Sequence, residues 1–417
     1  MRESMDPPRF LLLLPPCPSP PSPASLKAGY GETIRQTFTE ITARASDSHR
    51  ASVLEIALAL PHLVDHERLS RSSLHAATQD RLAAVYRLVG ISAAERDINL
   101  ETSDGVDVRV LLVAWDPRTS DKAERCESGR YGPIISIGTL AQSSRAWKCA
   151  FGVKSETGEA MMRAFVAAKG SGEEFVRLRS GPVMRRAGTD DVREDRAGVR
   201  PANVERSRNR HHHVAIGGTF DHIHIGHKLL LTMATLAVDH SELSDAEERT
   251  LTVGITGEQL LKAKKHAEVL ESWEERCKSV VTFINAIVDF TPPAALTQRR
   301  VSQRDAPGAN GKSTDVHYPN GWAIRCTEIQ DPFGPTITEE RISAMVISAE
   351  TRAGGNAVND KRSEKCWTPL ELFEVDILNR DDGDDDESDR RAKANFEHKL
   401  SSTAIRERIV KQQQSSL

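Results

Sequence analysis

The sequence predicts an α/β protein in which a smaller α/β domain precedes a second domain built on a parallel sheet. Three observations support this prediction. Short apolar runs typical of buried parallel strands alternate with helical patterns along the chain. Residues 178–212 are rich in Arg, Asp and Gly and poor in large apolar side chains, which is typical of a flexible linker. Directly after this segment, a strand that ends in two glycines leads into a helix.

Length and charge limit the classes of protein to consider. The 417 residues are enough for two or three domains. The 56 basic and 60 acidic side chains give a net charge of −4, so the chain as a whole has no electrostatic reason to bind nucleic acid or an anionic membrane. Aromatic residues make up only 5%, which argues against a stacking surface for single strands. We therefore expect neither nucleic acid nor a membrane as a partner.

The N-terminus and the cysteines bear on the cellular location. The apolar run Phe10–Leu14 is too short for a secretion signal and is followed by two prolines, so it predicts a β-strand. No run in the sequence approaches the roughly 18–20 apolar residues of a membrane span. The six cysteines are scattered and form no CxxC pair, which fits a reducing compartment. Together these observations predict a cytoplasmic protein.

The first domain, residues 1–177, contains regular elements but no recognisable chemical motif. Apolar runs predict strands, and helical periodicity predicts helices, in alternation along this part of the chain. The strands fall at 10–14, 53–58, 106–115 and 133–138, and the helices at 27–46, 76–90 and 159–168. Residues 15–26 are rich in Pro and Ser, which predicts a connector that is neither helix nor central strand.

The second domain, residues 213–417, opens with a strand from His213 and a helix at 228–238. Two insertions, 291–320 and 380–392, have the composition of loops. A final helix is predicted at 403–411, and the histidines at 211–213 are expected in a solvated entry segment. Because a linker precedes this domain, we expect a fragment that starts near Arg208 to keep its fold and some activity.

The strongest chemical signal is the segment that follows the first strand of the second domain. It reads Gly217-Gly218-Thr219-Phe220-Asp221-His222-Ile223-His224-Ile225-Gly226-His227. Glycines let a ligand approach the backbone, and the helix that follows offers free N–H groups and a partial positive charge to an anion. His224 and His227 lie one helical turn apart, so both can donate hydrogen bonds to charge that develops on one phosphorus.

This segment, GGTFDHIHIGH, resembles the (G)TFDxxHxGH signature of nucleotidyltransferases with an HxGH motif. These enzymes join a nucleoside monophosphate to an acceptor and release pyrophosphate. Residues 400–406 (LSSTAIR) resemble the second signature of the superfamily, ISSTxxR, with Leu in place of Ile. The resemblance implies a Rossmann-like parallel sheet whose site lies at the carboxyl ends of the strands.

Segments between the two signatures resemble eukaryotic phosphopantetheine adenylyltransferases, the adenylyltransferase half of coenzyme A synthase. They are 253–264 (VGITGEQLLKAK), 330–336 (QDPFGPT) and 346–351 (VISAET), the last followed by Gly354-Gly355, Asn359 and Arg362. The resemblance covers about residues 213–412. The kinase half of coenzyme A synthase needs a P-loop, but residues 308–314 (GANGKST) have Ala306 where that pattern requires Gly, so we expect no P-loop there.

The resemblance implies roles for individual residues. The catalytic residues are expected to be His227, His224 and Lys262, with Lys264 as the next choice among the lysines. Lys264 and Arg362 are also candidates for substrate binding. The ATP phosphates are expected to contact Gly217, Gly218, Thr219, Phe220, Gly226, Ser401, Ser402, Thr403 and Arg406. No protein ligand is expected for a metal ion, so Mg²⁺ would accompany ATP and be held by phosphate and water oxygens.

The implied reaction transfers AMP from ATP to 4′-phosphopantetheine and yields dephospho-CoA and pyrophosphate. The attacking phosphate is already anionic, so no general base is expected, and catalysis would come from positioning and electrostatic stabilisation. Two alternatives stay open. One is a sister nucleotidyltransferase that uses CTP with an alcohol phosphate, or ATP with nicotinamide mononucleotide. The other is a catalytically inactive scaffold, and association with other enzymes of the CoA pathway is compatible with each reading.

Overall fold

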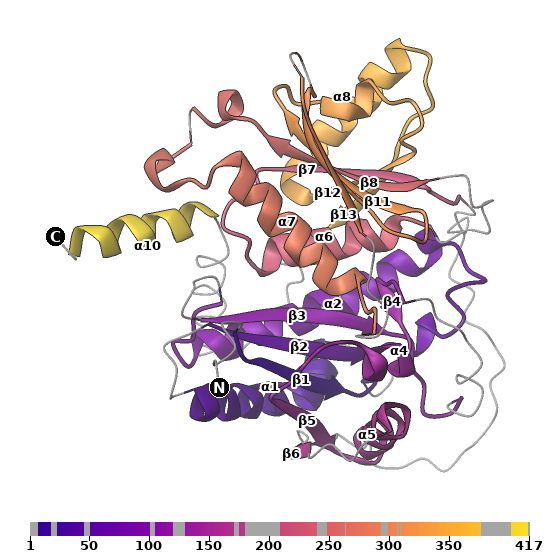
Figure 1. The fold of residues 1–417 in the computed structure, drawn as a ribbon, viewed down its shortest axis with the longest axis vertical. Coiled ribbons are helices and arrows are strands. Elements are labelled where there is room, and N and C mark those ends of the chain that lie inside the picture. Colours follow the sequence, from indigo (N-terminus) through magenta and orange to yellow (C-terminus); the bar gives the residue numbers. More distant parts are fainter. Residues whose placement is uncertain are drawn as a thin grey trace.

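The computed structural model describes residues 7–17, 23–45, 51–100, 105–119, 130–170, 175–179, 209–239, 248–262, 264–292, 299–306, 308, 310–376 and 402–415. Within these residues the chain forms two sheets that lie one above the other, with α2, α6 and α7 between them (Figure 1). The predicted α/β class, with a first domain that has its own sheet, is confirmed. Most of the predicted linker and the whole insertion 380–392 lie outside the described residues.

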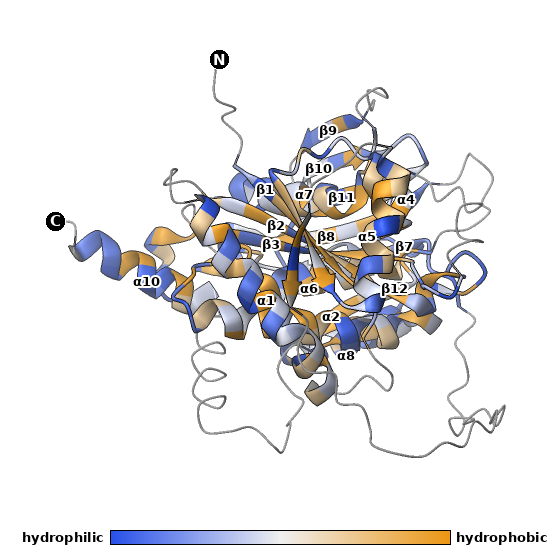
Figure 2. Cartoon of the chain, turned by 90° about the horizontal axis from the view of Figure 1, so that it is seen from below, coloured by the Kyte–Doolittle hydropathy of each residue, from blue (hydrophilic) through white to orange (hydrophobic). Residues whose placement is uncertain are grey.

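The first half contains a six-stranded parallel sheet in the order β4-β3-β2-β1-β5-β6. Its strands are β1 (Arg9–Leu14), β2 (Ser52–Ala59), β3 (Val106–Val113), β4 (Ile134–Ile135), β5 (Cys149–Lys154) and β6 (Phe175–Arg179). Its helices are α1 (Pro23–Ala45), η1 (Pro61–Leu63), α2 (Arg71–Ala94), α4 (Ile137–Gln142) and α5 (Glu156–Lys169). The short apolar runs predicted as strands are buried in this sheet. Figure 2 shows the hydropathy of the residues along the chain.

The second half contains a seven-stranded sheet in the order β13-β12-β7-β8-β11-β10-β9, of which the first five are mutually parallel. Its strands are β7 (His213–Gly218), β8 (Arg249–Thr256), β9 (Arg300–Asp305), β10 (Lys312–His317), β11 (Trp322–Ile329), β12 (Ala344–Ser348) and β13 (Glu371–Val375). Its helices are α6 (Ile225–Ala237), α7 (Trp273–Val288), α8 (Arg352–Glu364), α10 (Ser402–Ser415) and the short η2 (Glu258–Leu261), η3 (Ala267–Val269), η4 (Gly334–Ile337) and η5 (Ala349–Thr351).

The two sheets share one strand order. In the first, the chain starts at β1, adds β2 and β3 on one side and then crosses to place β5 and β6 on the other. In the second, β7 is followed by β8 and β11 on one side and by β12 and β13 on the other. Open α/β sheets bind ligands at the carboxyl ends of the strands where the order reverses, which here is next to β7. Two glycines end β7 at this point and the motif turn follows them, whereas β1 is followed by two prolines.

Three element predictions need correction. Helix α1 begins at Pro23, inside the predicted connector, because proline is tolerated in the first turn of a helix. The strand predicted at 133–138 is shortened, since α4 already begins at Ile137. The insertion 291–320 is not all loop. It includes β9 and β10: β10 pairs antiparallel with β11, and β9 pairs antiparallel with β10 and forms the edge of the sheet.

The segment 308–314 runs into strand β10, and the expectation that it forms no P-loop is confirmed. Lys312 begins strand β10, whereas a P-loop lysine would begin a helix. Gly311 is needed for the tight connection, because a Cβ at this position would lie 1.8 Å from the carbonyl oxygen of Ala306. The glycines therefore serve the β9–β10 connection.

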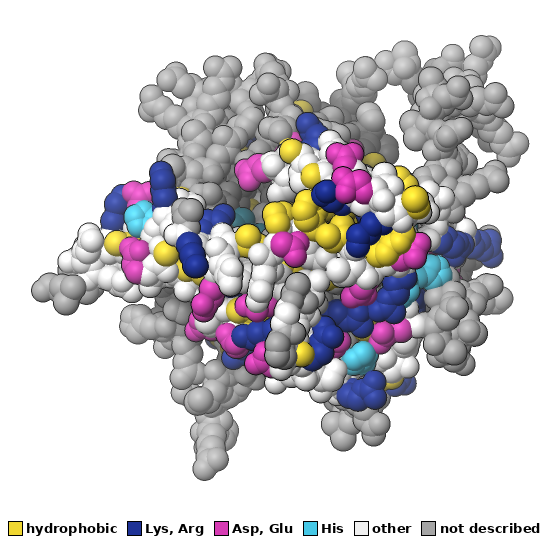
Figure 3. Space-filling view, turned by 90° about the horizontal axis from the view of Figure 1, so that it is seen from above, with side chains coloured by type: hydrophobic (Ala, Val, Ile, Leu, Met, Phe, Trp, Pro, Cys, Tyr) yellow, Lys and Arg dark blue, Asp and Glu magenta, His cyan; other side chains and the backbone are white. Residues whose placement is uncertain are grey.

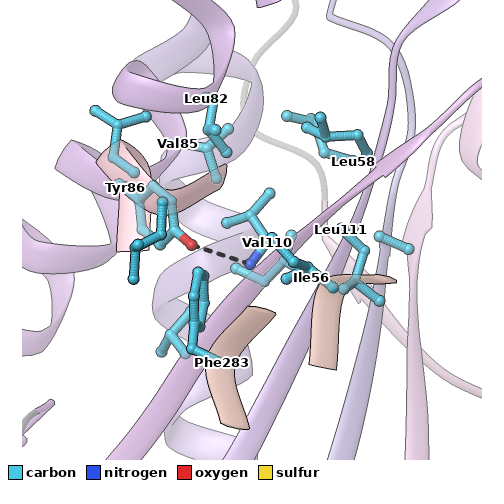
Figure 4. Packing of buried hydrophobic residues seen from close by; sticks show 14 of the residues in the cluster. Ile56, Leu58, Leu82, Val85, Tyr86, Val110, Leu111 and Phe283 are labelled. Carbon is cyan, nitrogen blue, oxygen red and sulfur yellow. Dashed lines mark hydrogen bonds between the residues drawn. The ribbon is translucent and has the colours of Figure 1, made fainter. Parts of the chain in front are cut away.

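One apolar core continues from the first half into the second. Helix α2 packs on the first sheet, and α7 of the second half reaches the same cluster (Figure 4). Figure 4 shows Tyr86 of α2 and Phe283 of α7 on one side of Val110 of β3, and the backbone N–H of Val110 donates to the Tyr86 hydroxyl at 3.3 Å. The layer between the two sheets is therefore built from residues of both halves.

A polar contact fixes the halves to each other at the C-terminal end of α7. Arg145 of the first half forms an ion pair with the buried carboxylate of Glu55 at 2.7 Å and donates to the carbonyl oxygens of Ala286 and Asp289. Its guanidinium also lies over the ring of Phe290, 4.1 Å from the centroid. These contacts, with the shared core, oppose the expectation that a fragment starting near Arg208 keeps its fold, because the fragment would expose this apolar layer.

The outer surface shows mixed character. On the face seen in Figure 3, apolar side chains gather near the centre, and basic and acidic side chains lie around them. Among the described helices, none is both long enough and apolar enough to span a lipid bilayer. Helix α10 extends from the side of the body where the chain segments after β7 and β8 lie (Figure 1).

Candidate active site

The backbone after β7 turns sharply at the predicted ligand-binding segment. Gly217 is exposed, and a Cβ added to it would meet no atom within 4 Å, so the space beside this backbone is open. Phe220 and His222 have φ angles of 52° and 47°, a left-handed conformation that is costly for residues other than glycine. The Phe220 ring is buried and anchors the turn in the core. The segment therefore combines a fixed anchor with an open glycine, which suits close approach of a ligand.

The two motif histidines lie together at the start of α6. His224 is the N-cap residue of this helix, and its Nδ1 accepts a hydrogen bond from the backbone N–H of Gly226 at 3.2 Å. Because an accepting Nδ1 carries no proton, neutral His224 carries its proton on Nε2 and can donate from that atom. The His224 and His227 rings stack with their centroids 4.0 Å apart. Both imidazoles are thus placed at the positive end of the helix dipole.

Burial keeps both imidazoles neutral at neutral pH. It lowers the pKa of His227 to about 4, although the Asp221 carboxylate acts in the opposite direction. It also lowers the pKa of His224 well below the ordinary value, and the neighbouring His227 and Lys228 add to this shift. Nδ1 of His227 is enclosed and has no hydrogen-bond partner in the part of the chain that the structure describes. Hydrogen bonding from His227 to a ligand is therefore expected through Nε2.

The second signature meets the first at Asp221. The Asp221 carboxylate is fully buried and accepts from Nη1 of Arg406 at 2.5 Å. The Asp221 carbonyl oxygen accepts from the Ser402 hydroxyl at 3.0 Å. These two contacts join the first turns of α10 to the turn that precedes the histidines. The two sequence signatures are therefore parts of one site.

The position of Arg406 differs from the expected phosphate contact. Besides the bond to Asp221, its Nε donates to the carbonyl oxygen of Lys265 at 3.0 Å, and its Nη2 donates to the Thr403 hydroxyl at 3.2 Å. Each guanidinium nitrogen thus already has a protein acceptor, and the side chain is 2% exposed. Arg406 stabilises the docking of α10, because its charge is paired inside the protein. Ser401 lies outside the described residues.

The three lysines of the LLKAKK stretch lie next to this junction. Lys262, Lys264 and Lys265 are exposed in the segment between η2 and η3, and the carbonyl of Lys265 binds Arg406 as described above. This contact holds the lysine segment against the start of α10. Lys265 therefore lies next to the second signature, and the side chains of Lys262, Lys264 and Lys265 are exposed to solvent.

Arg276 is a site component that sequence reasoning missed. It lies in the first turns of α7 and is 1% exposed. Its Nη1 donates to the carbonyl oxygens of Thr219 at 2.8 Å and Thr256 at 2.9 Å, and its Nε donates to the carbonyl of Glu271 at 3.0 Å. Arg276 thereby ties together the backbone that follows β7 and β8. An arginine near a helix start is usually a solvated residue, so only the tertiary packing reveals this role.

Arg362, predicted as a candidate for substrate binding, is not part of this site. Its side chain is 1% exposed and donates to four backbone carbonyl oxygens. These acceptors belong to Thr336, Glu340, Ile342 and Thr368. Arg362 therefore stabilises the chain around η4 and the end of α8, because its donors are directed at backbone in the interior.

His211, expected in a solvated entry segment, is instead buried. Its Nδ1 lies 2.9 Å from the Ser343 hydroxyl, and its Nε2 lies 2.9 Å from Glu371. The residue is 4% exposed and also contacts the ring of Phe373. The start of β7 is therefore fixed to the strand at the edge of the sheet, far from the histidines at its other end.

Comparison with known proteins agrees with the site geometry. Residues 215–408 match the family model described as cytidylyltransferase-like, and residues 1–184 match a family described as a domain of unknown function. An uncharacterized protein of Schizosaccharomyces pombe is 32% identical over 198 residues, which are 47% of this chain and 48% of that protein.

Two proteins named phosphopantetheine adenylyltransferase are also similar. The protein of Saccharomyces cerevisiae is 30% identical over 53% of this chain and 54% of its own length, and that of Methanothermobacter thermautotrophicus is 27% identical over 41% of this chain and 76% of its own length. The chain thus matches about half the length of the two yeast relatives. These matches confirm the resemblance of the second half to HxGH-motif nucleotidyltransferases, and among them to phosphopantetheine adenylyltransferases.

Proposed function

We propose that this protein transfers AMP from ATP to 4′-phosphopantetheine and releases pyrophosphate. The observation that carries this proposal is the junction at Asp221, where the two signatures meet beside two neutral, stacked histidines. Open backbone at Gly217 and the start of α6 lie on the same turn. This combination supports binding of a triphosphate at the carboxyl ends of the strands.

The neutral state of the histidines supports a role as hydrogen-bond donors. The attacking phosphate of phosphopantetheine is anionic, so it needs no base. Nε2 of His224 and of His227 would donate to oxygens of the α-phosphate as negative charge builds up in the transition state. The exposed ammonium groups of Lys262 and Lys264 would neutralise the phosphates, with Lys262 as the first candidate.

The choice of 4′-phosphopantetheine is supported by the three segments between the signatures and by the names of two relatives. Mg²⁺ would enter with the triphosphate. The described residues contain no group of three or more His, Cys, Asp or Glu side chains that could hold a metal ion. The proposal assigns the ion to phosphate and water oxygens, because Mg²⁺ keeps much of its hydration and commonly binds through substrate phosphates.

Pyrophosphate release by the purified full chain tests the proposal. ATP and CTP are each combined with 4′-phosphopantetheine, glycerol 3-phosphate and nicotinamide mononucleotide, with and without Mg²⁺. We expect Mg²⁺-dependent release only for ATP with 4′-phosphopantetheine, and dephospho-CoA in the product by mass spectrometry. Turnover with another pair, but none with this one, would assign the protein to a sister reaction. A chain that binds ATP and turns over no pair would be a scaffold.

A further inference from the structure

A lysine next to the motif histidines reaches into the first half of the protein. Lys228 follows His227 in the first turn of α6 and is 3% exposed. Its ammonium group donates to Oδ1 of Asp107 at 2.5 Å and to the carbonyl oxygen of Val108 at 3.0 Å. Both acceptors belong to β3 of the first sheet. The turn that carries the histidines is therefore held by a strand that lies more than a hundred residues earlier.

Asp107 is arranged to hold a cation at this position. Its other oxygen, Oδ2, accepts from Nε and Nη2 of Arg109 at 2.8 Å and 2.6 Å. Burial alone would raise the pKa of Asp107, but Lys228 and Arg109 outweigh this effect and hold the pKa well below its usual range. Asp107 therefore stays ionised, with one oxygen for each half of the protein.

Loss of the contact between Lys228 and Asp107 is costly because a buried ammonium group needs a partner for its charge. An unpaired charge in a protein interior costs several kcal/mol, so the side chain or the helix turn must move when the partner is lost. The backbone of the same turn also forms a hydrogen bond, in which the carbonyl oxygen of Lys228 accepts from the Thr232 hydroxyl at 2.7 Å. A displacement of Lys228 would therefore move the adjacent His227 and, through the ring stack, His224.

We propose that the first half of the protein positions the histidine turn, and that Asp107 and Val108 do so by holding Lys228. Asp107 and Lys228 are positioning residues, since neither is expected to contact the substrate. The kinetic part of this inference rests on the proposed function. A displacement of about 1 Å of a catalytic group can lower a rate by about 100-fold, so the contact can control turnover without a large change in binding.

The test compares two inter-half contacts in the full chain. Asp107→Asn removes the charge that holds Lys228, and Arg145→Met removes the contact at the far end of α7. Asp116→Asn is the control, because it breaks an ion pair with Arg118, whose side chain is 82% exposed. Thermal melting, the kcat and the KM for ATP are measured for each, together with hydrogen exchange of the amides of residues 225–231 without substrate.

We expect Asp107→Asn to lower kcat by roughly 10- to 100-fold with little change in the KM for ATP. Exchange at 225–231 should become faster. Arg145→Met should leave kcat and the exchange of residues 225–231 nearer to wild type. For this comparison, each variant is assayed at the same number of degrees below its own melting temperature. Adding Lys228→Met to Asp107→Asn should restore part of kcat, because the unpaired ammonium group is then gone. If Asp107→Asn does not fold, Asp107→Glu keeps the charge and displaces it by one methylene.

Several results would overturn the inference. One is a wild-type kcat and wild-type exchange in the Asp107 variants, and another is an equal loss in Arg145→Met at matched stability. If the wild-type chain turns over no nucleotide and acceptor pair, the proposed function fails, but hydrogen exchange at 225–231 still decides whether Asp107 holds the turn.

Discussion

Asp221 and Arg406 are 185 residues apart in the sequence and form a buried ion pair of 2.5 Å. Their side chains are 0% and 2% exposed. The pair links the turn before the motif histidines to the helix that contains the second signature. An arginine that would be expected to bind phosphate thus serves to assemble the site, and this difference can be tested.

The first prediction concerns Arg406→Met. Removing one partner of a buried ion pair destabilises a protein by about 3–5 kcal/mol, so we expect a lower melting temperature and faster hydrogen exchange in α10. Turnover should fall because α10 no longer holds Ser402 against Asp221. Lys411→Met is the matched control on the same helix, because it breaks an exposed ion pair with Glu407. Weaker ATP binding with unchanged exchange in α10 would show that Arg406 acts on the phosphates instead.

The second prediction concerns His227→Ala. Loss of one donor to the transition state typically lowers kcat by about 10²–10³, and we expect this range with a much smaller effect on the KM for ATP. His224→Ala should behave similarly but more mildly. Steady-state kinetics and a thermal melt of each variant provide the measurement. His317→Ala, a histidine on β10, is the control, and near-normal turnover in His227→Ala would refute the proposed role.

The third prediction concerns stability in acid. Burial lowers the pKa of His75 to about 4, below the value of about 6.5 expected in the unfolded chain. Between these values the unfolded chain binds a proton that the folded chain does not. The free energy of unfolding therefore increases as the pH rises from about 4 to about 6.5, and it decreases again as the pH falls through this range. For this one group the slope is at most about 1.4 kcal/mol per pH unit.

Urea unfolding between pH 4 and pH 7 measures this effect. The His75 ring lies against the ring of Phe373, with centroids 4.6 Å apart, and its Nε2 has no partner in the described part of the chain. His75→Phe therefore keeps an aromatic contact and removes the titration. We expect a shallower pH dependence in the variant. Equal slopes for the variant and the wild type would contradict the assignment.

The fourth prediction concerns the separated second half. A fragment of residues 209–417 exposes the apolar face of α6 and α7 and loses the partner of Lys228. We expect it to aggregate or to melt far below the full chain, and to recover when residues 1–179 are added in trans. A protease site inserted within 180–208 provides the matched control. After cleavage, the two halves should elute together in gel filtration, and a stable, active fragment would show that the halves are independent.

The pattern of elements could be predicted because it depends on local sequence. Apolar runs bounded by Pro and Gly identified β1, β2, β3 and β7, since a strand covered on both faces needs an apolar run. Strands β9 and β10 were not predicted, because the sequence there contains no such apolar run. β9 lies at the sheet edge with every residue exposed, so its sequence carries no apolar run, and its strand conformation is stabilised by backbone pairing with β10.

The sequence by itself determined the type of site, because the motif places glycines, two histidines and a helix start within eleven residues and local geometry brings them together. Only the tertiary structure decided which charged side chains belong to the site. Arg276, Arg362 and Arg406 are all arginines near helix ends in the sequence. Their roles depend on acceptors that distant segments supply, and Lys228 depends on Asp107 of the other half. A buried charge is stable only where the fold provides its partner, and no local pattern encodes that partner.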